Sequence, residues 1–155
     1  VNRYGQPESV RRFFSAVSRL GDGGAWALLG LAALAIRGPE ALPFIVRAIV
    51  VAAIGVGLYK LLKRHLLRER PYIASDEIRC GTPPLDRYSF PSGHTLHAVS
   101  FATMFGEFEP LLLVAAAPFA LLVAASRVVL GLHYPSDVLA GAAIGAGLAT
   151  AALSF

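Results

Sequence analysis

Residues 41–62 read ALPFIVRAIVVAAIGVGLYKLL, an apolar run that only Arg47 and Lys60 interrupt. Because about 20 apolar residues in a helix are enough to cross the hydrocarbon core of a bilayer, this run can form a transmembrane helix. The composition of the whole chain agrees, since 55% of its 155 residues are hydrophobic and only 15% are charged. A soluble domain so rich in apolar residues would be unusual, so the sequence predicts an integral membrane protein.

Four further apolar runs flank this one. They cover residues 24–36, 91–105, 110–125 and 135–155. Each of the last three begins at or next to a proline, which suits the first turn of a helix. Gly141 and Gly145 form a small-xxx-small pair that would let the last helix approach a neighbour closely. We therefore predict an all-α bundle of about five transmembrane helices, forming a single domain over residues 1–155.

Two polar regions complete the predicted architecture. Residues 1–22 carry apolar side chains at helical spacing with arginines on the other faces, a pattern that predicts an amphipathic helix lying on the membrane surface. Residues 63–90 are polar and rich in proline, which indicates an active-site loop or short helices outside the hydrocarbon. If the spans alternate in direction, both regions lie on the same face of the membrane as residues 126–137.

This topology gathers seven polar residues at one depth on one face. They are Lys63, Arg70, Ser92, His94, Arg127, His133 and Asp137. Three cations, two histidines and a carboxylate at a membrane boundary can bind a multiply charged anion and transfer protons, and phosphate fits this set best. The turn at residues 91–94 opens a helix, where free N–H groups favour an anion and Gly93 allows the backbone to approach it closely.

The same residues fall into three motifs with fixed spacing. The motifs read KRHLLRERP at residues 63–71, PSGH at 91–94 and SRVVLGLHYPSD at 126–137. In this order and spacing they resemble the motifs of the type 2 phosphatidic acid phosphatase family, over about half of the chain. The resemblance implies a membrane phosphatase that hydrolyses a lipid phosphate through a phosphohistidine intermediate.

Three of these residues are candidates for the chemical steps. His133 is the predicted nucleophile, because a neutral imidazole can attack phosphorus in line, and the resemblance implies the same role. Asp137 would accept the N–H of the other ring nitrogen and so fix the tautomer, although a carboxylate here could merely serve a helix N-terminus. His94 would protonate the leaving oxygen as a general acid, with a capping or packing role as the alternative.

The remaining candidates would bind the substrate. They are Lys63, Arg70, Ser92, Gly93 and Arg127. The cations would neutralise the phosphate oxygens, with each arginine donating two hydrogen bonds in a fixed fork, although isolated cations at such places could equally snorkel to the interface. The sequence offers no carboxylate cluster for Mg²⁺, so we predict a site without a metal or any other cofactor.

Other basic residues have less specific interpretations. His97 lies one helical turn from His94, and packing or a bond to the backbone is its expected role. Five residues are interpreted as interfacial charges that attract anionic headgroups: Arg64, His65, Arg68, Arg79 and Arg87. The net charge of +4 is therefore assigned to contacts with membrane lipids, and nucleic acid is not an expected partner.

The motifs leave the substrate and the orientation open. Phosphatidic acid, phosphatidylglycerophosphate and polyprenyl phosphate or diphosphate all fit. The alternatives are a non-catalytic carrier of phospholipid headgroups and a relative of acid phosphatases or vanadate haloperoxidases. All lysines and arginines except Arg37 and Arg47 fall on the site face, which places the site on the cytoplasmic side of the cell membrane by the positive-inside rule. The resemblance points the other way, because many lipid phosphatases of that family face outward.

Overall fold

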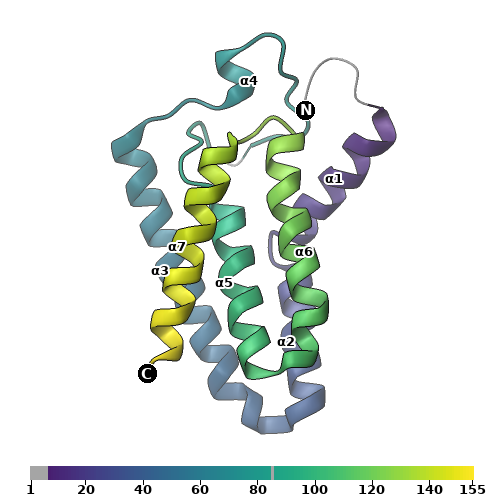
Figure 1. Cartoon of the computed structure of the whole chain (residues 1–155), viewed down its shortest axis with the longest axis vertical. Helices are drawn as coiled ribbons and strands as arrows, with labels where there is room; N and C mark the ends of the chain where they lie inside the picture. The colour runs from purple at the N-terminus through teal and green to yellow at the C-terminus, as the bar shows by residue number, and fades with distance from the viewer. Residues whose placement is uncertain (1–6, 85) are drawn as a thin grey trace.

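A computed structural model describes residues 7–84 and 86–155, and these residues form a helical bundle (Figure 1). The helices are α1 (Glu8–Leu20), α2 (Gly24–Arg37), η1 (Gly38–Glu40), α3 (Ala41–Leu66), α4 (Pro71–Ala74), α5 (Gly93–Phe108), α6 (Pro110–Val129) and α7 (Pro135–Leu153). The long helices α2, α3, α5, α6 and α7 form the bundle, and α1 packs at an angle against one end of it (Figure 1). The predicted all-α fold is confirmed.

Each predicted span is a helix, but several boundaries differ from the prediction, among them the ends of α3 and α6, which continue to Leu66 and Val129. The third helix continues to Leu66 and ends where Leu67 takes a left-handed backbone conformation, with φ of +45°. Lys63 therefore lies inside α3, and the predicted start of the polar loop at this residue is wrong. The fifth helix begins at Gly93 rather than at Pro91, because Ser92 has an extended backbone and forms its N-cap.

The lengths of the helices do not by themselves give the number of membrane spans. In the described part of the chain, three segments are long and apolar enough to cross a membrane: Gly24–Leu66, Pro110–Val129 and Pro135–Leu153. The first contains both α2 and α3, which η1 joins into a hairpin at the lower end of the bundle in Figure 1. The 16 residues of α5 fall short of a full span, so five crossings stay a prediction.

The central helix is α5, which packs against α7, α6 and α3. Its contact with α7 is close because two glycines of α7 face the α5 backbone. A Cβ atom added at Gly141 would lie 2.5 Å from the carbonyl oxygen of Ser92, and one at Gly145 would lie 2.3 Å from that of Leu96. The predicted small-residue contact is thus confirmed, and it holds the PSGH turn against the start of α7.

The N-terminal helix α1 has two different faces. Val17 and Ser18 are buried, and Val17 packs against Val123 of α6 in one hydrophobic cluster. Phe13 and Leu20 remain exposed, as does the polar side on which Arg12 pairs with Glu8. The helix is therefore amphipathic, while its place at the membrane surface stays a prediction. Residues 1–6 of the predicted 1–22 segment lie outside the described residues.

One end of the bundle collects the polar connections. The end of α3, the segment that contains α4, and the turn between α6 and α7 all lie at the upper end in Figure 1. An isolated antiparallel bridge between Glu69 and Tyr88 ties the two arms of the long loop together. The three motifs therefore meet at this end, as the alternation of spans predicted.

Candidate active site

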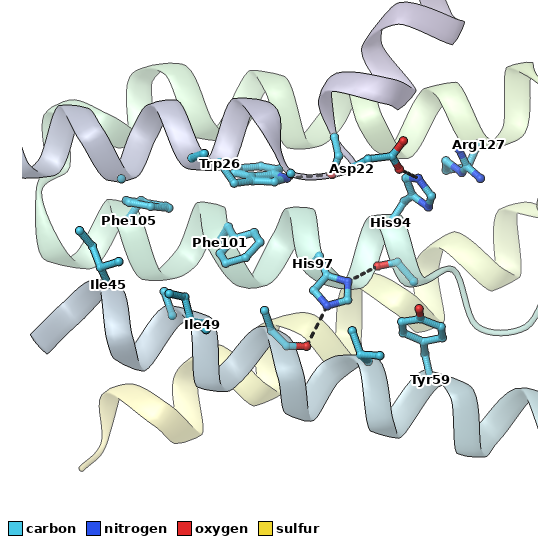
Figure 2. Close-up of a pocket in the computed structure, with 18 of the residues that line it drawn as sticks. Asp22, Trp26, Ile45, Ile49, Tyr59, His94, His97, Phe101, Phe105 and Arg127 are labelled. Atoms are coloured by element: carbon cyan, nitrogen blue, oxygen red, sulfur yellow. Dashed lines mark hydrogen bonds and ion pairs between the residues drawn. The ribbon is translucent and has the colours of Figure 1, made fainter. Parts of the chain in front are cut away.

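A cavity of about 620 Å³ opens at the polar end and continues between α2, α3 and α5 (Figure 2). Its polar end is lined by Asp22, Tyr59, Lys63, Arg70, Asp86, Gly93, His94, Arg127 and His133. Its other end is apolar, with Trp26, Ile45, Ile49, Phe101 and Phe105 on its walls. One continuous space thus joins a charged region to a groove that suits hydrocarbon.

His133 lies in the turn between α6 and α7. Gly131 makes this turn possible with φ of +72°, and the His133 N–H bonds to the carbonyl of Arg127 at 3.0 Å. The ring is buried, with Nε2 3.2 Å from Nη1 of Arg70 and Nδ1 3.6 Å from Oδ2 of Asp137. The second distance is longer than a hydrogen bond, although the two atoms face each other.

The environment of His133 favours its neutral form. Burial lowers the pKa of the imidazole, and the carboxylate of Asp137 opposes this effect. The positive charges of Arg127, Arg70 and Lys63 then lower the pKa further. A neutral ring has a free lone pair, which is the form that a nucleophile requires.

Asp137 is held in place by its position in the first turn of α7. Its Oδ2 accepts the backbone N–H of Tyr134 at 2.8 Å, as in a capping box, while Oδ1 accepts from Nη1 of Arg68 at 2.8 Å. Arg68 also bonds to Ser136 at 2.8 Å and lies 4.1 Å from the ring centre of Tyr134. Arg68, which was interpreted as an interfacial charge, therefore has a more specific contact, because it pairs with the carboxylate beside His133.

Lys63 and Arg70 meet at a carboxylate that the motifs do not contain. Nζ of Lys63 lies 2.7 and 2.9 Å from the two carboxylate oxygens of Asp86. Nη2 of Arg70 donates to Oδ1 of Asp86 at 2.8 Å, while its Nη1 donates to the carbonyl of Leu132 at 2.9 Å. The two buried cations therefore bind one oxyanion together, which is the property that a phosphate group would need.

Arg127 reaches the cavity from the last turn of α6. Its Nη1 donates to the hydroxyl of Ser18, which comes from α1. The Nε atom is buried and has no hydrogen-bond partner among the described residues. A buried donor without a partner costs about 1–3 kcal/mol, so an anion bound here would satisfy a group that the protein leaves unpaired.

The PSGH motif divides into residues in the cavity and residues behind its wall. Gly93 and His94 line the cavity, and a Cβ atom added at Gly93 would lie 3.1 Å from the ring of Tyr59. Ser92 is buried behind them, with its hydroxyl 3.0 Å from that of Thr95 and its N–H 3.0 Å from the carbonyl of Asp137. A contact between Ser92 and substrate therefore stays a prediction.

His94 has a carboxylate partner that sequence reasoning missed. Its Nε2 lies 2.5 Å from Oδ1 of Asp22, in the turn between α1 and α2 (Figure 2). His97, by contrast, has its ring nitrogens 2.8 and 3.1 Å from the carbonyl oxygens of Gly93 and Ala52, so the expected bond to the backbone is confirmed. Within residues 7–84 and 86–155, no three His, Cys, Asp or Glu side chains are grouped as ligands for a metal ion.

Comparison with known proteins identifies the family. A family model described as the PAP2 superfamily matches residues 44–155, which include all three motifs. The chain belongs to this superfamily. A PAP2 relative, the decaprenylphosphoryl-5-phosphoribose phosphatase of Mycobacterium tuberculosis, is 40% identical over 122 residues, which make up 77% of this chain. The aligned region is 63% of that relative, so the chain spans less than two thirds of its length.

Two solved structures share the architecture. Aquifex aeolicus LpxE superposes with a TM-score of 0.77 and 25% identity, covering 99% of this chain and 90% of its own. A transmembrane PAP2 type phosphatidylglycerolphosphate phosphatase from Bacillus subtilis gives a TM-score of 0.74 at 24% identity, covering 97% and 78%. Together with the apolar helices, these likenesses support a membrane-embedded PAP2 fold for this chain.

Proposed function

We propose that the protein is a membrane lipid phosphatase that hydrolyses a phosphomonoester or diphosphate on a lipid through a phosphohistidine intermediate. The observation that carries this proposal is the single cavity with a cationic end and an apolar groove. A lipid phosphate has the same two parts in the same order. The name of the Mycobacterium tuberculosis relative supports a substrate in which the phosphate belongs to a lipid-linked group.

In this proposal His133 attacks phosphorus through Nε2, the ring nitrogen that lies beside Arg70. Asp137 then stabilises the positive charge that develops on the ring, and its contact with Nδ1 shortens from the resting 3.6 Å. His94 protonates the leaving oxygen and afterwards accepts a proton from the water that releases phosphate from His133. His133 and His94 line the same cavity, so the attack on phosphorus and the two proton transfers of His94 can take place on one bound phosphate group.

The three cations and the PSGH turn form the proposed phosphate site. Lys63, Arg70 and Arg127 neutralise the phosphate oxygens, while Gly93 brings the N-terminus of α5 close to them. Ser92 contributes its place as the N-cap of that helix. Phosphate must displace Asp86 from Lys63 and Arg70, so we expect this carboxylate to move when substrate binds.

A phosphate-release panel tests the proposed function. Phosphatidic acid, phosphatidylglycerophosphate, and polyprenyl phosphate and diphosphate are each presented in detergent micelles with and without EDTA. We expect release from at least one lipid, no loss of rate in EDTA, and inhibition by orthovanadate, which mimics five-coordinate phosphorus. Binding without release would instead identify a headgroup carrier, halide oxidation with vanadate and peroxide a haloperoxidase, and strict dependence on Mg²⁺ would contradict metal-free chemistry.

We also propose that the site faces the cytoplasm across the cell membrane, because nearly all basic residues lie at its end of the bundle. Single cysteines at the exposed positions Asp76 and Glu107, in a Cys80→Ser background, test this orientation in intact cells. Position 76 belongs to the loop at the site end, and position 107 lies at the other end of α5. A membrane-impermeant reagent should label position 107 only, and labelling of position 76 alone would reverse the assignment.

A further inference from the structure

The turn between α1 and α2 contributes a carboxylate to the site from outside the matched family region. Asp22 lies in this turn, and its Oδ1 is 2.5 Å from Nε2 of His94. The family model begins at residue 44, so neither α1 nor α2 belongs to the matched segment. Figure 2 shows Asp22 and His94 pointing toward each other at the polar end of the cavity, with Arg127 beside them.

The backbone at Asp22 is fixed by the packing of a buried neighbour, Trp26, while the Asp22 side chain itself is half exposed. The indole N–H of Trp26 donates to the carbonyl of Gly21 at 3.1 Å, which fixes the turn immediately before Asp22. Trp26 is itself buried, and its ring packs 5.2 Å from that of Phe101 and 5.3 Å from that of Phe119. Asp22 is thus tied to the helices α5 and α6, although half of its side chain remains exposed.

The two nitrogens of His94 have different surroundings. Nε2 is engaged by Asp22, whereas Nδ1 has no hydrogen-bond partner among the described residues, and the ring lines the cavity. An imidazole that must deliver a proton needs one nitrogen free for the reacting oxygen and an anchor on the other. Lys63, Arg70 and Arg127 line the same cavity, so a protonated ring there also needs a nearby negative charge.

We propose that Asp22 is the positioning residue for His94, an inference that rests on the proposed phosphatase function. Its carboxylate accepts the Nε2–H of the imidazolium and aims the Nδ1–H at the leaving oxygen. When Nε2 of His133 bonds to phosphorus, the electron pair of the breaking P–O bond goes to that oxygen, which takes the proton from Nδ1 of His94. In the second step the oxygen of water bonds to phosphorus, the P–N bond breaks, and the proton of the water returns to Nδ1.

This role predicts that the effect of Asp22 depends on the leaving group. An alkoxide is a strong base and cannot leave without a proton, whereas a nitrophenolate is a weak base and can. The test compares two phosphomonoesters of matched chain length, decyl phosphate and a decyl-substituted nitrophenyl phosphate, in the same detergent. The measured quantity is kcat/KM, which covers the steps up to transfer of the phosphoryl group.

For Asp22→Asn we expect kcat/KM on decyl phosphate to fall about 100-fold, at the lower end of what general acid catalysis contributes. The value on the nitrophenyl ester should fall less than about 5-fold, because that leaving group does not need the proton. Asp76→Asn removes an exposed carboxylate from the loop and serves as the control, with both rates unchanged. Equal losses on the two esters, or no loss on decyl phosphate, would overturn the proposal.

A second variant keeps the test decisive if Asp22→Asn does not fold. Trp26→Phe keeps an aromatic ring in the core but removes the N–H that holds the Gly21 carbonyl. It should show the same preference, with a larger loss on decyl phosphate than on the nitrophenyl ester, and equal losses would again reject the positioning role. Failure of the wild-type protein to hydrolyse either ester would instead contradict the phosphatase function itself.

Discussion

The site contains two pairs of a histidine and an aspartate, and they are built in opposite ways. His133 and Asp137 are four residues apart in one motif, and both side chains are almost completely buried. His94 and Asp22 are 72 positions apart, and the Asp22 side chain is 50% exposed. The first pair is a local product of the turn that starts α7, while the second depends on the packing of α1 against α6 and of Trp26 in α2 against Phe101 in α5.

This difference indicates a division of labour. A nucleophile must be held in one tautomer and kept from water, which a short buried turn achieves. A general acid gives its proton to the leaving oxygen and regains one from the attacking water, and His94 lines the open cavity beside the half-exposed Asp22. Removal of His133 and of Asp137 tests whether the pairs act on different steps, and two further substitutions test the contacts that hold the site together.

The largest effect is expected when His133 is removed. His133→Ala should lower phosphate release by about 10⁴-fold or more on every substrate, because the variant lacks the proposed acceptor of the phosphoryl group. Inorganic phosphate should still raise the thermal stability of the variant, since the three cations remain. Turnover near the wild-type rate would exclude His133 as the nucleophile.

Asp137→Asn should lower kcat/KM by about 1,000-fold, because the amide can hold His133 in the wrong tautomer. The loss should be the same on the alkyl and nitrophenyl esters, unlike the loss in Asp22→Asn, since Asp137 acts on the attacking group. The Asn oxygen can still accept the N–H of Tyr134, but the ion pair with Arg68 is lost, so the melting temperature should also fall. A selective loss on the alkyl ester would show that the two pairs do not divide the steps.

The two pairs also differ in whether the sequence could predict them. Hydrophobic runs of helical length predicted all five bundle helices, and the motif spacing brought His133 and Asp137 together. Asp22 lacked any such signal, because a single aspartate between two glycines is ordinary turn chemistry. Its role depends on the packing of Trp26 against α5, which is a tertiary contact.

The dependence on tertiary contacts also explains why the ion pairs of the loop residues were not predicted. Arg68 lies within the first motif and Asp86 in the polar loop after it, but ion pairs between distant positions leave no periodic pattern. The position of Lys63 depended on where α3 ends, and Leu67, a residue that rarely adopts a left-handed conformation, ends it four residues later than the apolar pattern indicated. A glycine at position 67 would have predicted the end of the helix, because glycine is the usual residue in this conformation.

Gly145→Ala should disturb the contact between α5 and α7 that holds the two pairs in register. The added Cβ would lie 2.3 Å from the Leu96 carbonyl oxygen, two residues after His94, so we expect a loss of about 1–3 kcal/mol in stability. Gly147→Ala is the matched control on the same helix, because nothing lies within 4 Å of a Cβ there. The measurement is the melting temperature in detergent, and an equal change in both variants would argue against the close contact.

The smallest effect is expected for Ser18→Ala, which removes another contact between the N-terminal segment 8–23 and the site. The Ser18 hydroxyl accepts from Nη1 of Arg127, and both residues are buried. Without it the guanidinium keeps its charge but loses one anchor, so phosphate should bind less tightly and KM should rise about 3- to 10-fold. Because Arg127 is proposed to bind the phosphate and not the leaving oxygen, kcat/KM should fall equally on decyl phosphate and on the nitrophenyl ester. Asp22→Asn and Ser18→Ala each change one side chain of this N-terminal segment, so a merely structural role of the segment would give both variants the same profile. A selective loss in one and a uniform loss in the other would show that the segment supplies two distinct functions to the site.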